Sequence, residues 1–147
     1  MKTILLIAIG NSFRRDDGAG PMVAEKLADT PGLDILILPG EGTELLEAWS
    51  GHNDVLVVDA MRSGEVPAGG IRRFDALVET LPKDAFPCLS HRFGLAEAVE
   101  MGRILGRLPA SLTIFGIEAE DFAQGPGLTS AVAAGVDRLV AEIRSLI

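Results

Sequence analysis

Residues 3–28 read TILLIAIGNSFRRDDGAGPMVAEKLA, and the order of features in this stretch decides the fold class. The apolar run 3–9 is short and rich in Ile and Leu, which is typical of a strand buried on both faces. It passes through the glycine-rich segment 10–20 to Pro21, a residue suited to the first turn of a helix. A strand followed by a loop and a helix begins a βαβ unit, so the stretch predicts an open, mostly parallel α/β sheet.

The remainder of the chain repeats this alternation of strands and helices. The clearest helical periodicity is the last one, with apolar residues spaced from Leu128 to Ile143. A length of 147 residues matches one ordinary domain, and we expect a single domain spanning residues 1–147. The predicted strands are residues 3–9, 33–38, 54–59, 70–74 and 111–117, and the predicted helices begin at Pro21 and near residues 45, 95 and 128.

The composition narrows the classes of partner and location. The formal net charge is −8, and Lys and Arg form no cluster able to follow a phosphate backbone, so we expect no nucleic-acid partner. The single cysteine, Cys88, excludes an internal disulfide and a multi-cysteine zinc site. The segment 1–10 has no small-residue cleavage site, and no run approaches the roughly 20 apolar residues of a membrane span. We therefore expect a cytoplasmic protein with no membrane partner.

Two aspartates lie where predicted strands end. Asp17 belongs to the loop after the first strand, and Asp59 directly follows four strand-forming residues. Ligands of open α/β sheets bind beyond the carboxyl ends of the strands, so both side chains are expected in one crevice. Each Asp taken alone would more often cap a helix or shape a turn. Two converging carboxylates are costly unless a proton or a cation lies between them, and this favours a cation site.

A histidine adds a third donor to this predicted site. The chain has two histidines, of which His52 has the context of an exposed turn and His91 precedes a predicted helix. Taken alone, His91 would more often be a helix-start residue bonded to the backbone. Together, two carboxylates and an imidazole suit Ni, Zn, Co or Mn and leave coordination positions open for a substrate.

Other chemistries fit the sequence less well. The glycine-rich loop has neither the G-x-G-x-x-G spacing nor a P-loop, and no serine lies in a G-x-S-x-G elbow. A Cys88–His91 pair is conceivable, although a buried structural cysteine is the more frequent case. A non-catalytic nucleotide- or ligand-binding module and a small-molecule metallohydrolase remain alternatives.

Taken together, these segments resemble the nickel–iron hydrogenase maturation endopeptidases, and the resemblance spans nearly the whole chain. The resemblance rests on Gly10-Asn11, Asp16-Asp17-Gly18-Ala19-Gly20, Val57-Val58-Asp59-Ala60, Ser90-His91-Arg92-Phe93-Gly94-Leu95 and Ile114-Phe115-Gly116-Ile117-Glu118.

The resemblance implies a specific reaction. Members of this family remove a C-terminal extension from the large-subunit precursor of a nickel–iron hydrogenase after nickel has been inserted. It also implies a three-layer α/β sandwich, in which a twisted, mostly parallel five-stranded sheet has helices on both faces. The family's metal-contacting residues fall on Asp17, Asp59 and His91, which would engage nickel supplied by the precursor; zinc or cadmium can substitute.

Two positions depart from the family pattern, and one role stays open. Asp17 stands where the family commonly has Glu, and Ala119 stands where it commonly has Pro. The shorter Asp17 carboxylate would change the metal geometry, whereas Ala119 would affect a turn. Asp16 could orient a metal ligand, act as general base, or cap the helix. With no dedicated nucleophile in view, a water activated by the metal or a carboxylate is the preferred hypothesis.

Overall fold

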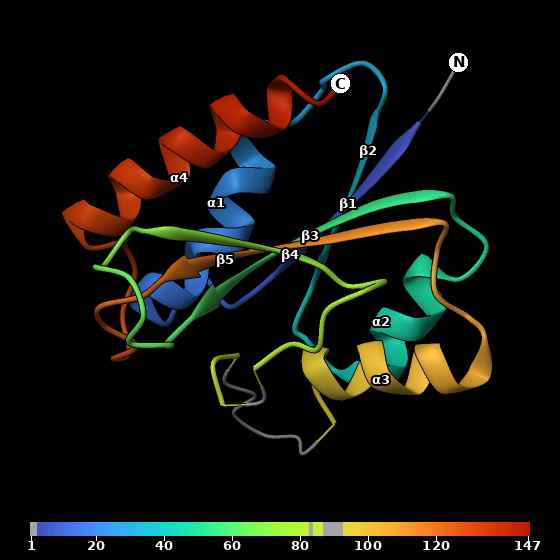
Figure 1. Ribbon diagram of the computed structural model, residues 1–147. Coiled ribbons are helices and arrows are strands. Elements are labelled where there is room, and N and C mark those ends of the chain that lie inside the picture. Colours follow the sequence, from blue (N-terminus) through green and yellow to red (C-terminus); the bar gives the residue numbers. More distant parts are fainter. Residues whose placement is uncertain (1–2, 83, 87–92) are drawn as a thin grey trace.

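The computed structural model describes residues 3–82, 84–86 and 93–147 (Figure 1). Strands and helices alternate through most of the chain, as the sequence predicts. The elements are β1 (Ile4–Ile9), the 3-10 helix η1 (Arg15–Gly18), α1 (Ala19–Lys26), β2 (Leu33–Leu38), α2 (Gly42–Trp49), β3 (Asp54–Met61), β4 (Ile71–Asp75), α3 (Leu95–Leu105), β5 (Ser111–Glu118) and α4 (Ser130–Arg144).

The five strands form one sheet in the order β2-β1-β3-β5-β4. The first four strands of this order are parallel to one another, and only β4 runs antiparallel, beside β5. Helices α1 and α4 cover one face of the sheet and α2 and α3 cover the other (Figure 1). The predicted three-layer α/β architecture is therefore confirmed.

The core explains why the strands read as continuous apolar runs. All six residues of β1 are buried, because alternate side chains enter opposite layers. Leu5 and Ile7 pack in the layer of α2 and α3, whereas Ile4 and Leu6 pack in the layer of α1 and α4. The sheet is thus covered on both faces around its central strands.

Element boundaries differ from the prediction at functionally relevant places. Strand β3 continues to Met61, so Asp59 lies two residues before the end of the strand rather than at its end. Helix α1 begins at Ala19, two residues before Pro21, because the 3-10 turn η1 leads directly into it. Helix α3 ends at Leu105 since Gly106 takes a left-handed conformation with φ of 66°. The apolar spacing in the sequence predicts a longer helix, which would end near residue 108.

The helices are of moderate length. The longest, α4, has 15 residues and buries one apolar stripe, which includes Val136, Leu139 and Ile143. Across residues 3–82, 84–86 and 93–147, no helix has the length and apolar character needed to cross a bilayer.

Candidate active site

The loop after β1 and the last residues of β3 lie together at the carboxyl edge of the sheet. Strands β1 and β3 are direct neighbours, with Ala8 aligned to Val58. Helix α1 starts hard against both strands: a Cβ on Gly20 would lie 2.3 Å from the Ile9 carbonyl oxygen and 3.0 Å from that of Val58. Only glycine permits this approach. The glycine-rich loop therefore serves close packing of α1 on the sheet, and this packing holds Asp17 near the end of β3.

In the structure, the negative charge of Asp17 acts on the carboxyl group of Asp59. Asp59 is 5% exposed. Burial raises the pKa of Asp59 well above its usual range, the negative charge of Asp17 raises it further, and the Ala60 N–H opposes the shift. Burial also raises the pKa of Asp17, against the Asn11 N–H, which donates to Asp17 Oδ2 at 3.0 Å, and the positive charge of Arg14. The pair is disfavoured in its doubly charged form.

This electrostatic situation suits a divalent cation. A cation between the two carboxylates would replace their repulsion by attraction and stabilise both in the ionised form. Within the described ranges, no group of three or more His, Cys, Asp or Glu side chains is placed to hold a metal. Asp17 and Asp59 could thus supply two ligands of a metal, and any further ligand would have to come from elsewhere.

The third predicted ligand, His91, lies outside the described residues, as do Cys88 and Ser90. The described residue nearest to His91 in sequence is Phe93, whose carbonyl accepts the Gly42 N–H at 2.9 Å. Gly42 begins α2, directly after the loop that follows β2. Phe93 is therefore held at the loop after β2. The other histidine, His52, is exposed in a turn, as the sequence predicts.

Asp16 has a different role from its neighbour. It is fully buried and accepts hydrogen bonds from the backbone N–H groups of Glu120, Asp121 and Thr129, at 2.9, 2.9 and 2.8 Å. The Thr129 hydroxyl is also within hydrogen-bond distance of both carboxylate oxygens. Burial alone would raise the pKa of Asp16, but these hydrogen bonds outweigh it and lower the pKa.

Of the three roles considered for Asp16, positioning fits best. A low pKa makes a poor general base, because the proton is weakly held. Nor does an aspartate cap α1, whose N-cap residue is Gly18 with no side-chain hydrogen bond. The capping alternative is therefore wrong for both Asp16 and Asp17. Asp16 instead ties the loop carrying Asp17 to the segment between β5 and α4.

Two further residues shape this edge of the sheet and were not assigned a role from the sequence. The buried Glu118 accepts from the Ser63 hydroxyl at 2.6 Å and from the backbone N–H groups of Ser63 and Gly64. Arg14 donates to the Phe122 carbonyl at 3.0 Å while its charge acts on Asp17. The sequence could have indicated Glu118, because a carboxylate at the end of a buried strand is seldom buried without hydrogen-bond partners.

The chain matches a known protein family over most of its length. Residues 23–146 match the HycI family model, described as hydrogenase maturation protease. The hydrogenase expression/formation protein HupD from Rhodobacter capsulatus is 28% identical over 146 residues, which is 95% of this chain and 68% of that protein.

Solved structures share the fold. The hydrogenase maturating endopeptidase HybD from E. coli has a TM-score of 0.77 and 23% identity, with 96% of this chain and 89% of that chain covered. The [NiFe] hydrogenase maturation protease HybD from Thermococcus kodakarensis has a TM-score of 0.76 and 23% identity, with 98% of both chains covered. Since the family model covers most of the chain, the protein belongs to the hydrogenase maturation protease family and is an endopeptidase that processes hydrogenase precursors.

Proposed function

We propose that this protein acts in the cytoplasm and removes the C-terminal extension of a nickel–iron hydrogenase large-subunit precursor after nickel insertion. The observation that carries the proposal is the Asp17–Asp59 pair: burial raises the pKa of both carboxyl groups, and the charge of Asp17 raises that of Asp59 further. A site that favours a cation suits a hydrogenase precursor that already holds a nickel ion.

The same pair offers a physical basis for checking the precursor. Without a cation, the raised pKa values favour a proton on the pair, so its affinity for a metal-free peptide gains nothing from charge. A nickel ion held by the precursor would displace that proton and bind both carboxylates, with His91 as the proposed third ligand. Binding free energy would thus depend on whether nickel is present in the precursor.

The cut itself requires an activated water or a polarised carbonyl. A metal in this position can supply either, by lowering the pKa of a bound water or by drawing charge from the scissile carbonyl oxygen. The chain's own contribution is to orient the carboxylates: the Asn11 N–H fixes Asp17, and Asp16 holds the loop that carries it. Asp59 is fixed by its position inside β3.

The test is cleavage of a cognate large-subunit precursor prepared with and without nickel. We expect cleavage of the loaded form alone, and its loss in Asp17→Ala, Asp59→Ala and His91→Ala with folding retained. Glu47→Ala, at an exposed position of α2, is the control that should cleave normally. Equal cleavage of both precursor forms would overturn the nickel dependence. Retained cleavage in two of the three site variants would overturn the proposed site.

A further inference from the structure

Strand β2 forms an open edge of the sheet. Its one neighbour in the sheet is β1, and the Ile4 and Gly10 N–H groups donate to the carbonyls of Gly32 and Leu38. Because backbone groups alternate in direction along a strand, the even-numbered residues of β2 face β1. The N–H and C=O groups of Ile35 and Ile37 therefore point away from the sheet, and no partner for them lies in the described part of the chain.

Strand β2 has no bulge, lysine or proline within it, and its one charged side chain is Asp34. Edge strands are commonly shortened, bulged, or given lysine or proline, since free backbone groups recruit other strands. Strand β2 instead pairs with β1 without interruption over all six residues. It leaves Leu36 and Ile37 41% and 55% exposed. Exposed apolar side chains beside free backbone groups indicate a surface suited to an added strand.

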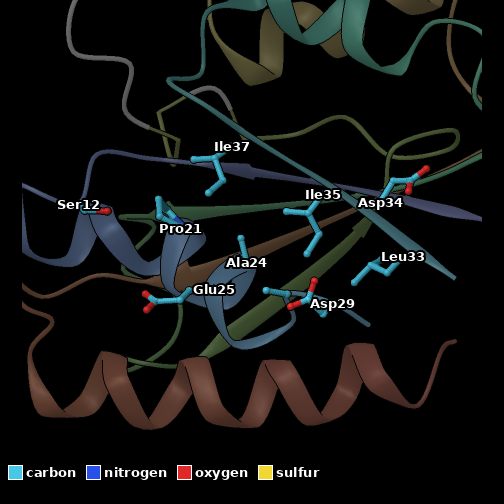
Figure 2. A pocket seen from close by; sticks show the side chains of 10 residues that line it. Ser12, Pro21, Ala24, Glu25, Asp29, Leu33, Asp34, Ile35 and Ile37 are labelled. Carbon is cyan, nitrogen blue, oxygen red and sulfur yellow. The ribbon is translucent and has the colours of Figure 1, made fainter. Parts of the chain in front are cut away.

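A groove runs between β2 and α1, with a cavity volume of about 610 Å³ (Figure 2). Its walls are largely apolar, and two carboxylates lie on it, Glu25 of α1 and Asp29 of the turn after α1, whereas the side chain of Asp34 lies on the opposite side of β2 from Leu33 and Ile35 (Figure 2). Among the residues that the structure describes, no basic side chain lines it. Its lining consists of Ser12, Pro21, Ala24, Glu25, Ala28, Asp29, Leu33, Asp34, Ile35 and Ile37.

The charge of the groove limits its occupant. Glu25 and Asp29 are exposed, and among the described residues neither has an ion-pair partner. A segment carrying Lys or Arg would therefore bind better than an acidic one, through charge complementarity. The apolar walls add a preference for aliphatic side chains at alternate positions, since alternate residues of an added strand face the same side.

One end of the groove reaches the loop that carries Asp17. Ser12 and Pro21 line it, and they belong to the loop and helix that flank Asp17. The carboxyl end of β2 is bonded to the same loop, where the Gly10 N–H donates to Leu38 and the Asn11 N–H donates to Asp17. A strand lying along β2 thus has one end at the loop that holds Asp17.

We propose that the β2 edge binds the precursor as an extended segment adjoining the scissile bond, by addition of a strand to Ile35 and Ile37. The inference rests on the proposed function, since that function supplies a peptide that must reach the site. The segment carries aliphatic side chains toward the groove and at least one Lys or Arg toward Glu25 and Asp29. The added strand positions the bond to be cut and takes no part in the chemistry.

Proline scanning of the two open edges tests this. Ile37→Pro removes one outward N–H and keeps the hydrogen bonds to β1, a change that edge strands tolerate. Arg73→Pro is the matched control: β4 is the opposite edge, and its even-numbered residues bond β5, as the Gly70 carbonyl and the Ala76 N–H show. We expect KM for the nickel-loaded precursor to rise about tenfold in Ile37→Pro, or about 1.4 kcal/mol, with kcat nearly unchanged. Arg73→Pro should match the parent protein.

A charge reversal gives an independent measurement. Glu25→Lys should raise KM severalfold and more strongly at low salt, whereas Glu47→Lys, on the exposed side of α2, should leave KM unchanged. Equal KM values for Ile37→Pro and the parent protein, with cleavage intact, would overturn the docking surface and leave the proposed function standing.

Amide hydrogen exchange separates docking from cleavage. On addition of a synthetic peptide spanning the precursor's cleavage site, the Ile35 and Ile37 amides should become protected even if no cleavage occurs. Absence of protection would overturn the docking surface. Protection that instead grows with protein concentration alone, with a dimer in sedimentation that Ile37→Pro dissociates, would assign the edge to a second copy and overturn the proposal as well.

Discussion

Asp16 and Thr129 are 113 residues apart in the sequence and are joined in the structure by the Thr129 N–H, which donates to Asp16 Oδ1 at 2.8 Å. Thr129 is the N-cap residue of α4, so the bond ties the start of the last helix to the loop after the first strand. That loop also carries Asp17. The geometry of the candidate active site thus depends on a carboxylate that takes no part in it directly.

The first prediction concerns the charge of Asp16. Asp16→Asn keeps the size of the side chain but loses an ionised acceptor of several hydrogen bonds, and we expect a loss of about 1.5–3 kcal/mol in the free energy of unfolding at pH 7. Because folding lowers the pKa of Asp16, its stabilisation is present above the usual Asp pKa and disappears as pH falls through the folded-state value.

Urea denaturation of both proteins from neutral to acidic pH measures this difference. Asp29→Asn, at an exposed position, is the control and should be close to neutral. A difference between Asp16→Asn and the parent protein that is constant with pH would contradict the role of the Asp16 charge.

The second prediction concerns Asp59, whose effect on stability changes with pH in the opposite direction to that of Asp16. Folding raises the pKa of Asp59, so ionisation weakens the folded state: stability is full below the usual Asp pKa and is lost as pH rises through the folded-state value. Asp59→Asn removes this loss. In metal-free protein we expect the variant to be more stable than the parent near neutral pH and similar to it in acid, while cleavage is abolished.

Thermal denaturation with a chelator present follows this comparison across pH. A lower melting temperature for Asp59→Asn at neutral pH would show that the carboxylate is stabilised by partners beyond those described. A restored stability of the parent protein on addition of nickel or zinc would fit the proposed cation site.

The third prediction tests the contact between α1 and the sheet. In Gly20→Ala the new Cβ would lie 2.3 Å from the Ile9 carbonyl oxygen, so α1 must shift and Asp17 with it. We expect a loss of about 1–3 kcal/mol in stability, the range for overpacking, and cleavage reduced at least tenfold since catalytic geometry tolerates little displacement.

Gly106→Ala is the control for the cost of replacing a glycine. Gly106 has φ of 66° with open space around its Cα, so alanine there should destabilise by about 1 kcal/mol without affecting cleavage. Normal cleavage in Gly20→Ala would show that the position of Asp17 does not depend on this packing.

The fourth prediction concerns the loop that follows β3. Glu118 accepts the Ser63 and Gly64 N–H groups, so Glu118→Gln, which turns one acceptor into a donor, should leave part of this contact unmade. We expect faster amide exchange at these two positions and little change in the core strands. Unchanged exchange at Ser63 and Gly64 would mean that the loop is held by other contacts.

Much of the fold follows from local sequence. The apolar runs that became β1, β2 and β5 differ from the observed strands by at most one residue at either end, because a strand buried on both faces must be apolar at nearly every position. Boundaries were less accurate where a tertiary contact extends an element. Strand β3 continues to Met61 since it pairs with β5 as far as Glu118.

The sequence by itself determined the parallel α/β sheet and the placement of Asp17 and Asp59 at the carboxyl edge of that sheet, since both follow from periodicity and from the direction of βαβ units. Only the tertiary structure decided which of the two adjacent aspartates ties the loop after β1 to the start of α4. Asp16 accepts a hydrogen bond from the backbone N–H of Thr129, whereas the negative charge of Asp17 acts on Asp59. Their pKa values diverge because hydrogen bonds and burial depend on partners far away in the chain. The open β2 edge is likewise a property of strand order, which no local pattern encodes.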